Sequence, residues 1–250
     1  MPDVFEKRLR RAQQLEKEWP FASDLLRFYG KVWGFQKEIL ESLKGTRSPG
    51  ARPPLSLLPK FLELVAREGP PPLAELAKST PDFKNLFERY GDGEPPEDPL
   101  LEFFPRVFMQ PGVMASIPRD LSMPASGESS YECPACGDRP LVSLLREDKS
   151  AETVRRSLIC AGCSHEWEFP RVLCPSCKED RPEKLPRYTA QEIPWMRVDG
   201  CDSCKKYLKS VDLTLNWEAE PVVDELASTP LDVIAHEHGY TKIAPNLAGI

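Results

Sequence analysis

The sequence lacks any long apolar run. No stretch approaches the roughly 18 consecutive apolar residues that a membrane-spanning helix requires, and residues 1–14 are rich in charge, without the apolar core of a signal peptide. The sequence also contains no P-loop, nucleophile elbow or dinucleotide-binding fingerprint. These absences predict a cytoplasmic protein that does not insert into a membrane. They also remove the commonest signatures of nucleotide-binding and hydrolytic enzymes.

Basic residues are not concentrated in any part of the chain. The formal net charge is −6, and residues 218–250 carry one basic residue against six acidic ones. Arg155-Arg156 and Lys205-Lys206 are isolated doublets. A nucleic-acid-binding protein needs a basic stripe to neutralise phosphates. The sequence therefore predicts no nucleic-acid partner, and a nucleic-acid-binding zinc ribbon is a less favoured alternative.

Prolines are abundant, and the 27 of them divide much of the first half into short helical patterns. Apolar residues recur at helical spacing in five runs, at residues 9–19, 25–43, 57–65, 80–91 and 100–108. Proline, glycine and serine in residues 111–130 indicate a linker. A helical pattern returns after Pro221, where Thr229-Pro230 separates two short helices because proline is tolerated in a first turn but not in a helix interior.

The cysteines define the rest of the chain. All eight fall in four C-x-x-C pairs with none left over: Cys133/Cys136, Cys160/Cys163, Cys174/Cys177 and Cys201/Cys204. A shift of 41 residues superimposes the first two pairs on the last two, which indicates an internal duplication of a C-x2-C-x23-C-x2-C unit. We expect each half to bind one ion through sequential pairs; a cross-braced arrangement, the first pair with the third, is the alternative.

Metal binding explains this spacing physically. Two residues between cysteines allow a tight turn to direct both sulfurs at one point, and a second turn completes a tetrahedron. A lobe of about 40 residues is too small to fold on apolar burial alone, whereas a structural zinc ion contributes about 10–16 kcal/mol in peptides. The prediction is two mononuclear ions, iron or zinc, in a reducing compartment. A structural metal is favoured over a redox-active or transferable one, and over thiol–disulfide chemistry.

Together these patterns predict a multi-domain protein of α plus small β class. An all-helical N-terminal domain is followed by two tandem rubredoxin-like or zinc-ribbon lobes and a short C-terminal helical segment. The expected boundaries are residues 1–120 for the helical domain, 121–130 for the linker, 131–172 and 173–217 for the two lobes, and 218–250 for the last segment.

Histidines and aromatic residues near the cysteines are given structural interpretations. Four thiolates per half suffice, so His165 is expected to support the site or lie at the surface rather than bind the ion. His236 and His238 are expected on a helix surface. Four aromatic residues are expected to cover the lobes or pack between them: Trp167, Phe169, Trp195 and Tyr207.

Several strings in the second half resemble the formate dehydrogenase accessory protein family FdhE. They are Cys133–Pro140, Cys160–Trp167, Arg171–Cys177, Asp224–Ser228, Leu231-Asp232, Glu237–Tyr240 and Pro245-Asn246. The resemblance implies a non-enzymatic cytoplasmic protein with two rubredoxin-like lobes. Such a protein binds the catalytic subunit of formate dehydrogenase during maturation. Iron is the metal associated with the rubredoxin comparison. A rubredoxin-like redox protein that passes electrons through mononuclear iron is the alternative, and the oligomeric state stays open.

Two departures and one hypothesis accompany the resemblance. A rubredoxin turn normally has glycine after its second cysteine, but only Gly137 meets this pattern, which counts against tuned electron transfer more than against metal binding. Pro230 interrupts a segment that is usually a cleaner helix. The acidic segment Pro221–Tyr240 is expected either to bind the partner, the catalytic subunit, through carboxylates such as Asp224 and Glu225, or to pack internally.

Overall fold

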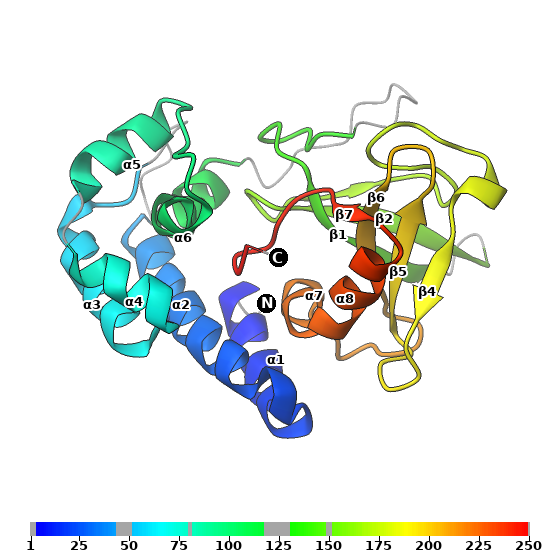
Figure 1. Ribbon diagram of the computed structural model, residues 1–250, viewed down its shortest axis with the longest axis horizontal. Coiled ribbons are helices and arrows are strands. Elements are labelled where there is room, and N and C mark those ends of the chain that lie inside the picture. Colours follow the sequence, from blue (N-terminus) through cyan, green and yellow to red (C-terminus); the bar gives the residue numbers. More distant parts are fainter. Residues whose placement is uncertain (1–3, 44–51, 80–81, 118–130, 149–151, 250) are drawn as a thin grey trace. The chain divides into compact units, whose positions relative to one another are not determined.

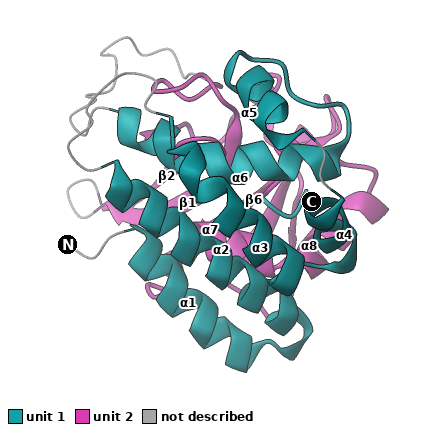
Figure 2. Ribbon diagram, turned by 90° about the vertical axis from the view of Figure 1, so that its left-hand side faces the viewer, with its two compact units in different colours: residues 1–117, 247–249 teal, residues 118–246, 250 magenta. Residues whose placement is uncertain are grey.

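The computed structural model describes residues 4–43, 52–79, 82–117, 131–148 and 152–249, and these form two compact units. Unit 1 comprises residues 1–117 and 247–249, and unit 2 comprises residues 118–246 and residue 250 (Figure 2). The expected linker, residues 121–130, and the Thr80-Pro81 helix start lie outside the described residues. No helix in the described part of the chain is long and apolar enough to cross a membrane.

Unit 1 is helical, as the apolar spacing predicts. Its helices are α1 (Val4–Glu18), α2 (Ser23–Ser42), α3 (Leu58–Glu68), α4 (Pro71–Lys78), α5 (Phe83–Gly91) and α6 (Pro99–Ser116). Aromatic rings fill its core. Phe61 is fully buried, and the centroids of Phe35, Phe103, Phe104 and Phe108 lie 5.3–6.3 Å from its own. Ring pairs at this separation stabilise a core beyond their apolar area.

Helix α6 corrects one expectation. The helix continues through Pro105 and Pro111 to Ser116, although the sequence predicted a linker from residue 111. Each interior proline removes a backbone hydrogen bond, but the aromatic face of α6 is buried over most of its length and compensates for that loss. A buried hydrogen bond also joins α2 to α6, because Gln36 Nε2 donates to the Val107 carbonyl at 2.8 Å.

Unit 2 is built on one seven-stranded sheet (Figure 1). Its strands are β1 (Pro140–Asp148), β2 (Thr153–Cys160), β3 (Glu166–Glu168), β4 (Arg187–Thr189), β5 (Met196–Cys201), β6 (Lys206–Asp212) and β7 (Thr241–Lys242). The order is β3-β2-β1-β6-β5-β4, and β7 pairs with β6. Within each half the neighbours are antiparallel, so each predicted lobe is a three-stranded meander.

A parallel pairing joins the two meanders. β1 runs beside β6 with Val142 opposite Lys209 and Leu145 opposite Asp212. The first strand of one lobe therefore lies beside the last strand of the other, and the lobes form a continuous sheet. The predicted fold class is confirmed, but the fusion of the lobes into one sheet was not predicted. The five-segment division of the chain stays a prediction.

Two short helices complete unit 2. α7 (Pro221–Ala227) packs against β1 and β6, and α8 (Thr229–Glu237) packs against β4 and β5. Thr229-Pro230 separates them, as the sequence predicts, because Pro230 occupies the first turn of α8. Gly239 then follows the end of α8 with a positive φ of 78°, the conformation in which glycine commonly terminates a helix.

Candidate metal centres

The structure groups the eight cysteines into two sets of four. The Sγ atoms of Cys133, Cys136, Cys160 and Cys163 lie within 4.8 Å of one another, and so do those of Cys174, Cys177, Cys201 and Cys204. Each set combines two consecutive pairs. The pairs are thus arranged sequentially, and the cross-braced alternative is wrong for this structure.

The strands explain how each set assembles. In both halves the first pair precedes the first strand of the meander, β1 or β4, and the second pair forms the turn after its middle strand. Cys160 ends β2 and Cys201 ends β5. The meander therefore brings the turn that holds the second pair back beside the first pair.

The four cysteine turns are closed by similar backbone hydrogen bonds. In the first, the Cys133 amide donates to the Asp138 carbonyl at 2.7 Å, and the Gly137 amide donates to the Cys133 carbonyl at 2.9 Å. The second and third turns repeat both bonds, and the last repeats the one from Lys205 to Cys201. The residue after each second cysteine has a positive φ of 55–80°, namely Gly137, Ser164, Lys178 and Lys205. Three side-chain-bearing residues thus adopt the conformation in which a rubredoxin turn has glycine.

Backbone amides point at the sulfurs. Cys133, Cys160 and Cys174 each accept a hydrogen bond from the amide two residues later, at 3.3–3.4 Å. Burial raises the pKa of the Cys174 and Cys177 thiols, and backbone amides, those of Ser176 and Glu179 among them, act in the opposite direction. Such amides spread the negative charge of a thiolate cluster. The thiolate is the form in which cysteine binds metal.

The sulfur spacing fits one ion per set. Cross-pair Sγ–Sγ distances are 3.3 and 3.6 Å in the first set and 3.6 and 3.8 Å in the second. A tetrahedral zinc–thiolate centre with bonds near 2.3 Å places its sulfurs about 3.8 Å apart, whereas a disulfide would require about 2.05 Å. The geometry and the all-sulfur donor set suit zinc or iron. Metal binding by these eight residues stays a proposal.

The turn geometry supplies a direct test at Lys178. Lys178→Gly is expected to exceed Lys178→Ala in unfolding free energy by about 0.5–1 kcal/mol. Both variants lose the contact between Lys178 Nζ and the Tyr131 ring, 4.6 Å from its centroid. Alanine keeps a Cβ in the left-handed conformation, which costs about 1–2 kcal/mol, and this outweighs the greater unfolded-state entropy of glycine, about 0.4–1 kcal/mol.

Denaturant unfolding of the metal-loaded variants measures this difference. Each variant must first show the same metal content as the natural protein. A more stable alanine variant would contradict the left-handed turn.

The other predicted residues lie as follows. His165 belongs to neither four-sulfur set, and its backbone carbonyl closes the turn by accepting from the Cys160 amide at 2.9 Å. His236 and His238 are exposed on α8 and just beyond it. Trp167, Phe169 and Tyr207 are buried, and Trp195 donates its Nε1 hydrogen to Asp224 at 2.9 Å.

The acidic C-terminal segment packs internally. Asp224, Glu225 and Asp232 are buried, so of the two alternatives for this segment the structure agrees with internal packing and contradicts a binding face formed by the Asp224 and Glu225 carboxylates. Glu225 lies 3.2 Å from Lys209 Nζ, pairs also with Lys242, and accepts from Asn246 at 3.2 Å. No local pattern indicates this cluster, because Lys209 lies in β6, outside the acidic segment.

Asp232 completes the cluster. It pairs with Lys209 at 2.6 Å and Lys242 at 3.1 Å, and accepts from the Tyr207 hydroxyl at 2.6 Å. Burial alone would raise the pKa of Asp232, but Lys209 and Lys242 hold it below its ordinary value. We call Lys209, Glu225, Asp232 and Lys242 the buried ionic cluster. It fastens α7 and α8 to β6 and β7.

The fold and the two four-cysteine sets together define a protein with a helical unit, a two-lobed sheet and two candidate metal centres. Residues 132–171 match the family model described as FdhE, central domain, and residues 172–248 match FdhE, C-terminal domain. Residues 132–248, which carry both four-cysteine sets, therefore match FdhE family domains throughout.

Individual relatives agree with this assignment. A protein FdhE homolog of Aquifex aeolicus is 23% identical across 96% of this chain and 94% of its own length. One from Pseudomonas aeruginosa is 35% identical over 48% of this chain and 40% of that protein. The crystal structure of the FdhE protein from Pseudomonas aeruginosa shares the fold, with a TM-score of 0.69, 24% identity, and 98% and 96% of the two chains covered.

Proposed function

We propose that this protein is a non-enzymatic accessory protein of formate dehydrogenase. In this proposal it acts in the cytoplasm and binds the catalytic subunit of that enzyme during maturation. The observation that carries the proposal is the FdhE family match, which extends without interruption over both four-cysteine segments, residues 132–248. All eight cysteines belong to the two sets that could hold a metal ion, which supports a structural rather than a catalytic use of their thiols.

Each ion would have a structural role. Cys133, Cys136, Cys160 and Cys163 would hold the first, and the other four cysteines the second. When bound, the ion would link two turns and contribute free energy of folding to a small lobe. The backbone amides hold the sulfurs in place, and the strands fix the spacing of the turns.

A capture experiment tests the proposed function. Tagged formate dehydrogenase catalytic subunit from the same organism is co-produced anaerobically with the full, untagged chain, and both are quantified after affinity purification. We expect stoichiometric recovery of the natural chain. Recovery of the double variant Cys133→Ser/Cys174→Ser should fall sharply, because this variant lacks one thiolate in each set. Ser176→Ala, which keeps all eight thiolates, is the matched control. Recovery of the natural chain no higher than on resin without catalytic subunit would disprove the proposal.

One observation favours a second candidate function, electron transfer through iron. Ser164, Lys178 and Lys205 adopt the left-handed conformation of a rubredoxin turn, so the absence of glycine does not disturb the hydrogen bonds to sulfur. Those bonds tune the potential of an iron–thiolate centre. Ferric tetrathiolate is red and zinc is colourless. A red protein that a mild reductant bleaches reversibly supports this function, and a colourless zinc-loaded protein that captures the catalytic subunit contradicts it.

A further inference from the structure

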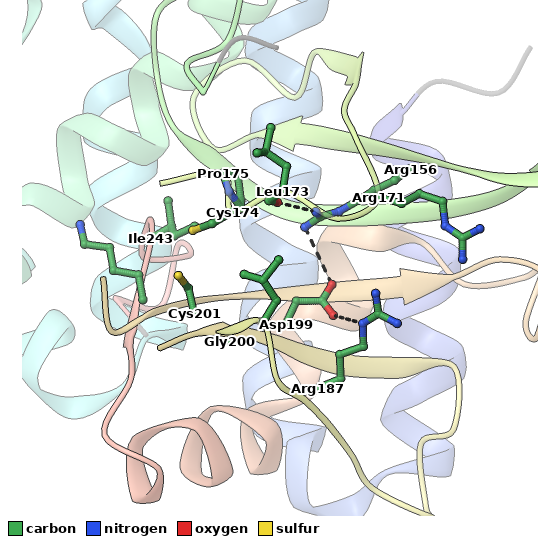
Figure 3. A pocket seen from close by; sticks show the side chains of 12 residues that line it. Arg156, Arg171, Leu173, Cys174, Pro175, Arg187, Asp199, Gly200, Cys201 and Ile243 are labelled. Atoms are coloured by element: carbon green, nitrogen blue, oxygen red, sulfur yellow. Dashed lines mark hydrogen bonds and ion pairs between the residues drawn. The ribbon is translucent and has the colours of Figure 1, made fainter. Parts of the chain in front are cut away.

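A groove rich in arginine lies beside the second four-cysteine set. Cys174 and Cys201 form part of its wall, and the basic residues that line it are Arg156, Arg171, Arg187 and Lys206 (Figure 3). Asp199 is the single acidic residue among the described residues that line it. Four positive charges therefore face one carboxylate. A divalent ion held by four thiolates adds about −2, which still leaves an excess of positive charge.

Asp199 already accepts hydrogen bonds from two neighbouring side chains. Its carboxylate accepts from Arg197 Nε at 2.8 Å and from the Ser210 hydroxyl. Arg187 Nε lies 3.6 Å away and Arg156 Nη2 3.8 Å away, both beyond the length of a good hydrogen bond. A carboxylate offers about four lone-pair sites, so Asp199 does not satisfy the donors of every guanidinium around it.

Arg156 forms the fixed floor of the groove. Its side chain is 4% exposed, and Nε donates to the Ser143 hydroxyl at 2.9 Å while Nη1 donates to the Leu173 carbonyl at 3.0 Å. Burial lowers the pKa of Arg156; the charge of Asp199 opposes this shift, and the charge of Arg197 adds to it. The position of this guanidinium is therefore set by the protein, before any ligand binds.

Arg171 and Arg187 provide the accessible donors. Arg187 begins β4 and its side chain is 49% exposed, and Arg171 follows β3 and is exposed. Figure 3 shows Arg187 beside Asp199, with Arg171 above it in the view. In the described part of the chain, the Arg171 side chain has no recorded hydrogen bond or ion pair, and Arg187 has none shorter than 3.6 Å. Both guanidinium groups retain N–H donors for a ligand.

We propose that this groove binds an oxyanion, carboxylate or phosphate, between Arg171 and Arg187, with Arg156 behind them. A guanidinium group donates two parallel hydrogen bonds that match two oxygens of such an anion. The ligand is either a free anion or an acidic side chain of a partner protein. The site neighbours the second metal centre, and its existence does not depend on the proposed function.

Calorimetry on the full, metal-loaded chain tests this proposal. The protein is titrated with inorganic phosphate, and separately with an acetylated tetraglutamate peptide, against sodium chloride of equal ionic strength. We expect saturable binding of one ligand per chain in at least one titration. Phosphate binding identifies a free-anion site, and peptide binding alone identifies a site for a partner's carboxylates.

Charge variants locate the binding. Arg171→Gln and Arg187→Gln are each expected to weaken it about tenfold or more, because each removes charge-assisted hydrogen bonds. Arg67→Gln, an exposed arginine of α3 beside Glu68, is the matched control and should change nothing. Metal content must equal that of the natural chain in every variant. The proposal is overturned by the absence of saturable binding to both probes, or by equal affinities in the two groove variants and the control.

Discussion

Glu225→Gln is expected to lower the free energy of unfolding by about 3–5 kcal/mol, the usual cost of removing one partner from a buried ion pair. Glu225 is fully buried between Lys209 and Lys242. Glutamine has nearly the same shape but no charge, so the variant leaves two buried ammonium groups against the single carboxylate of Asp232. Urea unfolding of the metal-loaded protein, followed by circular dichroism, measures the change.

Two controls separate this effect from general sensitivity to substitution. Glu218→Gln makes the same chemical change at an exposed position and is expected to shift stability by no more than about 0.5 kcal/mol. Adding Lys242→Gln to Glu225→Gln should recover part of the loss, because it removes one uncompensated charge. If Glu225→Gln is as stable as Glu218→Gln, the buried ionic cluster does not hold α7 and α8.

Cys133→Ser is expected to reduce the metal content from two ions per chain to one. The serine hydroxyl replaces a thiolate in a small lobe whose folding depends on the ion, and the Cys174 set lies in the other meander with all its sulfurs intact. Cys174→Ser is the reciprocal change and should also leave one ion. Metal analysis of protein purified without oxygen or chelator gives the count.

Thermal unfolding of the same variants reports on the shared sheet. Since β1 pairs with β6, loosening the first lobe is expected to lower the melting temperature of the second as well, even while the second ion stays bound. A serine variant that empties both sites would show that metal occupancy itself is coupled. A natural chain with one ion would contradict the two-site interpretation.

Cysteine spacing predicted the site more completely than it predicted the fold. A C-x-x-C turn is a local structure, and the 41-residue duplication makes each half complete, so the sequence favoured the sequential grouping that the structure shows and left the cross-braced one as the alternative. Helices with strong apolar spacing, such as α2, were also recognisable. These features depend on residues near one another in the chain.

Features that depend on distant residues were not predicted. One local element, helix α4, was also missed. Two prolines begin it, and the six residues that follow are too few to reveal a helical spacing of apolar residues. The pairing of β1 with β6 is a choice of edge, which local patterns do not specify. Lys209 has the sequence signature of an ordinary exposed strand residue, and only the tertiary structure places it against Glu225 and Asp232.

The parallel pairing of β1 with β6 also fixes an order of events during synthesis. Lys206, which begins β6, emerges from the ribosome 58 positions after Asp148, the end of β1. At about 5–20 residues per second, this delay is roughly 3–12 s. Until then, β1 has β2 on one side and an uncovered edge on the other, along the apolar stretch Leu141–Leu145. Such an edge is a template for pairing with other chains. The first lobe of the nascent chain is therefore most prone to self-association in this interval.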